Sequence, residues 1–163
     1  MSTLKVNNLL ETDGTVLPRI IQVVVTSSTT QESVTANTEL TTYRRTITPT
    51  NAANKMLLIA NIAVGTDNAY DGGISFIFDG SDIVASQGSG GTECSFATGM
   101  NENNSFCNQY TGFHIHHPNT TSEVTYSLRG KPNGSRSMFI NRRGLDTTYG
   151  FRSRFIVIEI GGI

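Results

Sequence analysis

Nonpolar residues recur along this chain at every second position or in short continuous runs, a pattern typical of β-strands. Residues 38–48, TELTTYRRTIT, alternate between two faces and end at Pro49, as expected of a strand with one polar face. Residues 19–26, RIIQVVVT, are rich in β-branched side chains and predict another strand. Residues 55–64, KMLLIANIAV, are the most apolar stretch and precede Gly65. They predict a central strand that is covered on both faces.

Turn signals divide the rest of the chain into further strands. Asp79-Gly80 lies between residues 73–78 and 82–86, and an Asp-Gly pair between two such runs predicts a tight hairpin. Residues 87–105 are rich in glycine and asparagine and are predicted to form a surface loop. The remaining strands are expected at residues 110–117, 123–129, 137–141 and 154–160.

These elements predict an all-β fold, an antiparallel β-sandwich with about eight or nine strands. A jelly roll, in which two sheets close over one core, is the favoured version. The length of 163 residues suits a single domain. Gly14 and Pro18 interrupt any regular element near the start. Residues 1–18 are therefore predicted to be a short extended N-terminal arm, and residues 19–163 the sandwich domain.

Composition and charge exclude several classes of partner. Charged residues make up 15% of the chain, with 12 basic against 13 acidic side chains, so neither nucleic acid nor a membrane surface is an expected partner. No apolar run approaches the ~20 residues of a membrane-spanning helix. Two cysteines, Cys94 and Cys107, make neither a disulfide framework nor a zinc cluster, and they are expected to pack as partly buried thiols.

All three histidines lie within FHIHHP, residues 113–118. On a strand, His114 and His116 share one face and His117 points the opposite way. These two imidazoles are the candidate metal ligands, although a zinc site requires at least three protein ligands. Three chains around a threefold axis would together supply six nitrogens to an octahedral metal ion. The simpler alternative is a pair of solvated or cross-strand-paired histidines on a sheet face, with no cofactor.

The sharpest enzymatic alternative is a cupin, a family of metal-binding jelly rolls. The chain resembles the first cupin motif, G-x5-H-x-H-x3,4-E-x6-G, at His114, His116, Glu123 and Gly130. Six residues rather than three or four separate His116 from Glu123. The second motif, P-x-G-x2-H-x3-N, is matched at Pro132, Gly134 and Asn141, with Ser137 in place of its histidine. No catalytic residues are assigned, and the chain is not predicted to be an enzyme.

Three stretches resemble small bacteriophage virion proteins. MSTLKVNNLLETDG, residues 1–14, resembles their S-T-L-K-V-N leader before a β-rich body. ITPTNAANKMLLIANIAV, residues 47–64, resembles their I-T-P-x-x-x-x-N-K step before an apolar strand. RFIVIEIGG, residues 154–162, resembles their terminal apolar strand, which ends in E-I or E-L. These stretches cover about a quarter of the chain, and residues 87–105 and the HIHH stretch depart from the resemblance.

The resemblance implies a non-enzymatic structural protein of the virion: a tail-fibre, tail-tip or head-fibre/decoration subunit, usually a homotrimer. Residues 1–18 would attach it to other virion proteins, and the loops at residues 65–73 and 87–105 would contact neighbouring subunits or a glycan on the host surface. Unpaired sandwich edges independently favour symmetric packing. Two alternatives from other classes are a cupin-like metal-binding protein and a lectin-like glycan-binding module.

Overall fold

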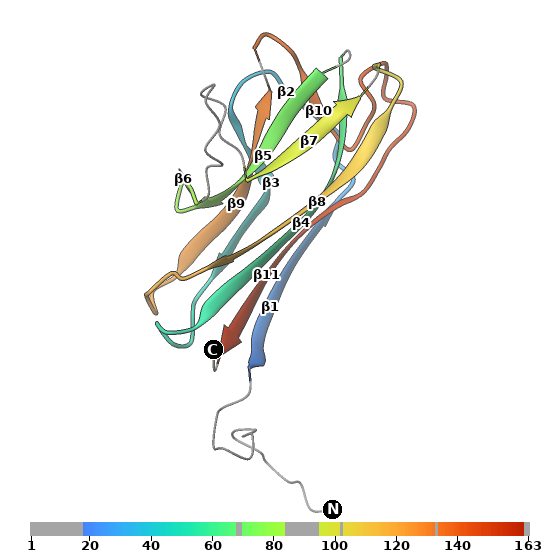
Figure 1. Cartoon of the computed structure of the whole chain (residues 1–163). Coiled ribbons are helices and arrows are strands. Elements are labelled where there is room, and N and C mark those ends of the chain that lie inside the picture. Colours follow the sequence, from blue (N-terminus) through green and yellow to red (C-terminus); the bar gives the residue numbers. More distant parts are fainter. Residues whose placement is uncertain (1–17, 68–69, 84–94, 102, 133, 162–163) are drawn as a thin grey trace, which may run out of the picture.

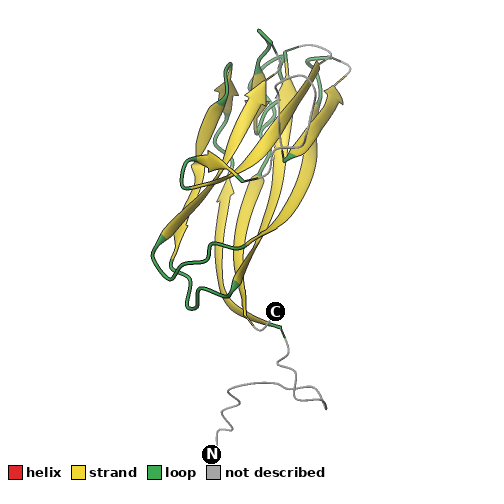
Figure 2. Ribbon diagram, turned by 60° about the vertical axis from the view of Figure 1, so that its left-hand side comes forward, coloured by secondary structure: helices red, strands yellow, loops and turns green. Residues whose placement is uncertain are grey.

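The computed structural model describes residues 18–67, 70–83, 95–101, 103–132 and 134–161. Two antiparallel sheets pack face to face, and strands run along the length of the sandwich (Figure 1). Within the described ranges every regular element is a strand (Figure 2). The predicted all-β sandwich is therefore confirmed. The predicted arm lies outside the described residues, apart from Pro18.

Each sheet is assembled from strands that are distant in sequence. The first sheet contains β1 (Arg19–Ser28), β2 (Glu32–Val34), β4 (Lys55–Thr66), β8 (Cys107–His116), β10 (Met138–Ile140) and β11 (Ser153–Gly161). The second sheet contains β3 (Thr38–Ile47), β5 (Tyr70–Phe78), β6 (Ser81–Asp82), β7 (Phe96–Asn101) and β9 (Val124–Pro132).

The order of the long strands is that of a jelly roll. In the first sheet β1 pairs with β11, β11 with β4, and β4 with β8, while β10 pairs with the end of β4 and β2 pairs with β10. In the second sheet β3 pairs with β9 and β9 with β5, and both β6 and β7 pair with β5. Among the long strands, the chain alternates between the sheets through β1, β3, β4 and β5, stays in the second sheet to β7, and alternates again through β8, β9 and β11. This path gives the two interlocked Greek keys of a jelly roll.

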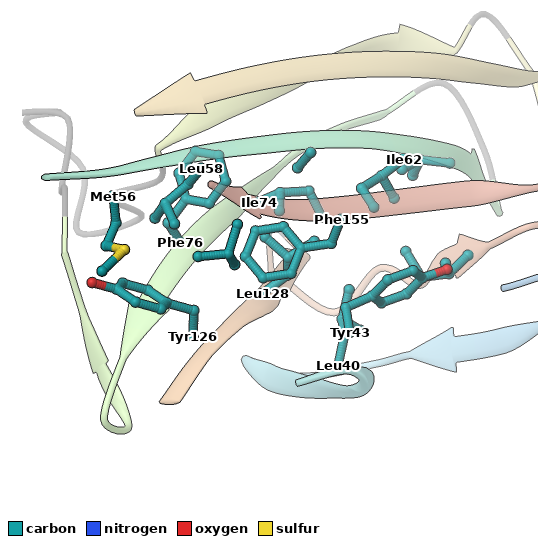
Figure 3. Packing of buried hydrophobic residues seen from close by; sticks show 14 of the residues in the cluster. Leu40, Tyr43, Met56, Leu58, Ile62, Ile74, Phe76, Tyr126, Leu128 and Phe155 are labelled. Atoms are coloured by element: carbon teal, nitrogen blue, oxygen red, sulfur yellow. The ribbon is translucent and has the colours of Figure 1, made fainter. Parts of the chain in front are cut away.

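The core lies between the sheets and is filled by the inward-facing residues of both. Alternate positions of β4, such as Met56, Leu58 and Ile62, are completely buried, because successive side chains of a strand point to opposite faces. They meet Phe76 of β5 and Phe155 of β11, whose ring centroids are 6.2 Å apart (Figure 3). The two sheets therefore share one continuous core.

Local predictions held where turn chemistry was clear and failed where glycines obscured a strand. Asp79 and Gly80 have φ angles of 45° and 85°, as the predicted hairpin turn requires. The prediction of one surface loop over residues 87–105 was wrong at Phe96–Asn101, which forms β7 and pairs with β5. Phe96 fits there because Gly112 leaves room for its ring; a Cβ at residue 112 would lie 2.2 Å from the Phe96 ring.

A buried carboxylate ties the end of β11 to the turn before β4. Glu159 is completely buried and accepts hydrogen bonds from Gln22 Nε2 at 2.6 Å, the Thr50 backbone N–H at 2.7 Å and Asn54 Nδ2 at 2.6 Å. The Thr50 hydroxyl adds a fourth at 2.8 Å. Burial acts to raise the pKa of Glu159, but these hydrogen bonds outweigh it and the pKa is lowered. The ITPTNAANK and RFIVIEI stretches thus meet at one side chain.

At the other end of the sandwich, a buried asparagine also links distant parts of the chain through its hydrogen bonds. Asn141 is completely buried, has a φ of 60° and donates from Nδ2 to the Thr30 carbonyl at 2.8 Å and the Tyr43 hydroxyl at 3.0 Å. Its Oδ1 accepts a hydrogen bond from Ser153 Oγ at 2.6 Å. Ser153 Oγ in turn accepts one from the Ala63 backbone N–H at 2.8 Å. The side chain of Asn141 therefore connects the two sheets.

The histidine strand and a candidate contact face

The histidines of β8 point into the sandwich. His116 Nδ1 lies 2.9 Å from the Tyr126 hydroxyl, and its ring centroid lies 4.5 Å from that of Phe78. The His114 ring stacks on Phe76 with centroids 6.5 Å apart. The two imidazoles share a face, as predicted. That face points toward an edge of the core that is lined by aromatic rings. His117, beyond the strand, is exposed.

The electrostatics of these rings follow from their packing. Burial lowers the pKa of His114, and burial with the neighbouring His114 and His117 lowers that of His116. Burial also raises the pKa of the Tyr126 hydroxyl, so the hydroxyl remains protonated next to His116. At neutral pH both imidazoles are therefore neutral packing groups.

The described residues do not assemble a metal centre around these rings. No group of three or more His, Cys, Asp or Glu side chains in the described ranges is placed to hold a metal ion. Glu123, which the cupin comparison required, is exposed and does not join His114 and His116 in such a group. Cys107 is half-buried and burial raises its pKa to about 12, while Cys94 lies outside the described residues. Metal binding by His114 and His116 stays a prediction.

Inward histidines make the stability of the fold depend on pH. The pKa values of His114 and His116 in the folded state lie below the ordinary value of 6.5, so the folded state binds fewer protons than the unfolded state near that pH. Their contribution to stability is full above about pH 6.5 and decreases as the pH falls toward the lowered values. Chemical denaturation between pH 7 and 5 should show this decrease.

Matched variants distinguish the contribution of the two inward histidines to the pH dependence from that of His117. His114→Gln with His116→Gln should flatten the pH dependence, whereas His117→Gln should retain most of it, because the burial that lowers the pKa values of both inward rings remains. An unchanged slope in the double variant would contradict the inward packing of these rings.

The opposite side of β8 and its neighbours carries apolar side chains outward. The register joins Val25 to Ile156, Ile156 to Ile59, and Ile59 to Phe113 in one row across four strands. The adjacent row runs from Val23 through Ile158 and Leu57 to Ile115. These two rows define the apolar face: Val23, Val25, Leu57, Ile59, Phe113, Ile115, Ile156 and Ile158.

The side chains of the apolar face are exposed to solvent on both of its edge strands, β1 and β8. Phe113 is 78% exposed and Ile115 49% on β8, and Val25 is 53% exposed and Val23 49% on β1. The prediction that residues 55–64 are covered on both faces was therefore wrong for Leu57 and Ile59, which are only half-buried. An outer sheet face is ordinarily polar in an antiparallel sandwich.

The outer side of the second sheet has the ordinary, polar character. Asp82 pairs with Arg129 at 2.7 Å and also with Lys131. Glu39 pairs with Arg44 at 2.8 Å and accepts a hydrogen bond from Ser127 at 2.6 Å; burial acts to raise the pKa of Glu39, but these partners lower it overall. The two outer surfaces of the sandwich are thus chemically different.

The apolar face was missed as a functional feature in the sequence, although its signal is present there. Residues 19–26, 55–64 and 154–160 are apolar at both odd and even positions, whereas a strand with one solvated face alternates. Three such strands side by side in one sheet produce an apolar outer surface. To recognise this surface from the sequence, one must know which strands are neighbours in the sheet.

The arrangement provides a surface for contact with another apolar surface, and the described residues bring no set of catalytic side chains together at it. No segment of the described chain forms a helix with the length and apolar character needed to cross a membrane. Comparison with protein-family models finds no matching family, and comparison with curated proteins finds no matching relative.

Proposed function

We propose that this protein is a homotrimeric structural subunit of a bacteriophage particle, of the tail-fibre, tail-tip or head-fibre/decoration type. The jelly roll forms the body of the subunit, and residues 1–18 attach it to other virion proteins. A glycan on the host surface is a further contact for its loops. The subunit carries out no reaction.

The observation that carries this proposal is the apolar face. A sandwich that turns eight nonpolar side chains outward in two complete rows is suited to a permanent assembly, because obligate interfaces are richer in nonpolar area than ordinary surfaces. The virion itself is suggested by the leader and strand motifs of residues 1–14, 47–64 and 154–162.

The ends of the domain suit attachment from one side. Arg19 at the start of β1 pairs with Gly161 at the end of β11, so the chain enters and leaves the sandwich at the same end (Figure 1). An arm that precedes Arg19 therefore begins at that end, and the opposite end of the sandwich, where β4 and β9 end, is directed away from it.

Deleting residues 1–18 should leave a folded domain that is no longer incorporated into particles. The core, the Glu159 contacts and the apolar face all lie within residues 19–161, so the deletion removes none of them. Particles would be purified from infected cells that supply a tagged full chain or a tagged chain lacking residues 1–18, and the tag would be quantified by immunoblotting.

A chain in which a Gly/Ser linker of equal length replaces residues 1–18 controls for length alone. Both altered chains should be absent from particles while showing the circular dichroism of the full chain. Incorporation of the truncated chain at full occupancy would show that the arm is not the anchor. Absence of the full chain from particles would contradict the virion assignment itself.

A further inference from the structure

Strand β8 has its polar and apolar sides in the reverse of the usual arrangement. Its imidazoles, His114 and His116, face the core, while Phe113 and Ile115 face outward. In a sandwich that remained alone in water, burying the two nonpolar side chains instead would give the larger hydrophobic gain. The observed orientation is favourable when the outer side of β8 is also removed from water.

The outward nonpolar side chains of the other strands in the apolar face are also more favourable when they are removed from water. Two rows of four side chains on strands about 4.8 Å apart cover roughly 300 Å² of flat sheet, about the size of the largest apolar patch on a typical monomer. A stable protein pair buries about 800 Å² on each partner. The apolar face therefore fits the nonpolar centre of such an interface, with the polar residues around it as the rim.

The rim has the composition of an interface edge. The row beyond Phe113 and Val25 is polar: Asn61 donates to the Thr111 hydroxyl at 2.8 Å, and the exposed Arg154 pairs with Asn61 across the strands. At the other end of the face, Lys55 lies opposite Ile160. The apolar centre is thus bounded by polar side chains at the Asn61 end, while on β1 at the Lys55 end it continues into the exposed Ile20, the partner of Ile160.

We propose that the apolar face is the surface at which copies of this chain pack against one another, so that the faces of three copies meet around a common axis and each contacts those of its two neighbours. This inference rests on the proposed homotrimer and adds the location of its contacts. A nonpolar centre without charged groups matches another nonpolar centre, and an identical copy always supplies one. A glycan or a charged partner would leave these side chains without a matching surface.

The positions of the chain ends constrain how the copies are related. Because Arg19 and Gly161 lie at one end of the sandwich, a rotation axis along the strands places all N-terminal arms at the same end of the assembly. An axis perpendicular to the strands would place them at opposite ends and prevent common attachment. The faces therefore surround an axis that runs along the strands.

The test introduces a charge at either side of the face. Val25→Lys on β1 and Phe113→Lys on β8 are made in the full chain, both at positions at least half exposed, where the monomer tolerates lysine. Thr46→Lys, on the exposed outer side of β3 in the second sheet, adds the same charge elsewhere. The mass of each protein is followed by analytical ultracentrifugation over a hundredfold range of concentration.

The Val25 and Phe113 variants should sediment as single chains with a thermal unfolding transition, while the unmodified chain and Thr46→Lys sediment as the same oligomer. Because the two variants lie on opposite edge strands, failure of one to fold leaves the other as the test. Oligomers in both face variants, dissociation of Thr46→Lys as well, or a monomeric unmodified chain would each overturn the inference. Particle incorporation is measured separately, so an oligomer that never enters particles would overturn the proposed function alone.

Discussion

Glu159→Ala should lower the free energy of unfolding by about 4 kcal/mol, because it removes a buried charged acceptor and leaves its donors unsatisfied. The Gln22 and Asn54 amides and the Thr50 backbone N–H all donate to this carboxylate within 2.7 Å. For a chain of this size the melting temperature should fall by roughly 10 °C. Differential scanning calorimetry at pH 7 measures both quantities.

Two control variants distinguish the hydrogen bonds from the loss of volume and charge. Glu159→Gln keeps the size and one acceptor oxygen but turns an NH₂ group toward donors, so its cost should be about half. Glu123→Ala removes an exposed carboxylate and should change stability by less than about 0.5 kcal/mol. If Glu159→Ala unfolds like Glu123→Ala, the carboxylate does not anchor the turn.

The acid sensitivity of the fold provides a second readout of the same site. The pKa of Glu159 in the folded state lies below the ordinary value of 4.5. Its contribution is therefore full above about pH 4.5 and is lost as the pH falls through the lowered pKa. Glu159→Ala should remove this part of the acid dependence, which the Glu123→Ala control retains.

Asn141→Ala should cost about 3–4 kcal/mol, the second largest effect expected of a single substitution here. The change removes the donor to Thr30 and Tyr43 and the acceptor of Ser153. It also places alanine at a φ of 60°, where an L side chain other than Asn costs about 1 kcal/mol. Urea denaturation followed by fluorescence of the tyrosines measures the loss.

Asn141→Gly separates the backbone from the side chain. Glycine accepts the left-handed backbone without a Cβ penalty, so this variant should lose the hydrogen bonds only and be about 1 kcal/mol more stable than Asn141→Ala. Equal stabilities for the two variants would indicate that the backbone conformation at residue 141 contributes nothing.

The sequence predicted elements well where local chemistry decides them. Pro49 and Asp79-Gly80 delimit strands because their backbone preferences act within a few residues, and the structure follows them. β7 was hidden because its strand, Phe96–Asn101, lies in a segment rich in glycine and asparagine. Its pairing with β5 and the space at Gly112 come from distant parts of the chain, which a local pattern does not contain.

The orientation of β8 shows a second limit of prediction from the sequence. Alternation correctly placed His114 and His116 on one face, but it does not say whether that face is the inner one. Hydrophobicity alone would turn Phe113 and Ile115 inward, and the structure turns them outward. On the inner face the imidazoles lie against Phe76 and Phe78 of the opposite sheet, partners that a local pattern does not contain.

The most direct test of the central claim, that the fold serves as a building block through its apolar face, is the molar mass of the unmodified full chain by multi-angle light scattering. One chain has a mass of 17.6 kDa. A single species with three times that mass, unchanged on dilution, is the predicted result. A species with the mass of one chain at every concentration would contradict it.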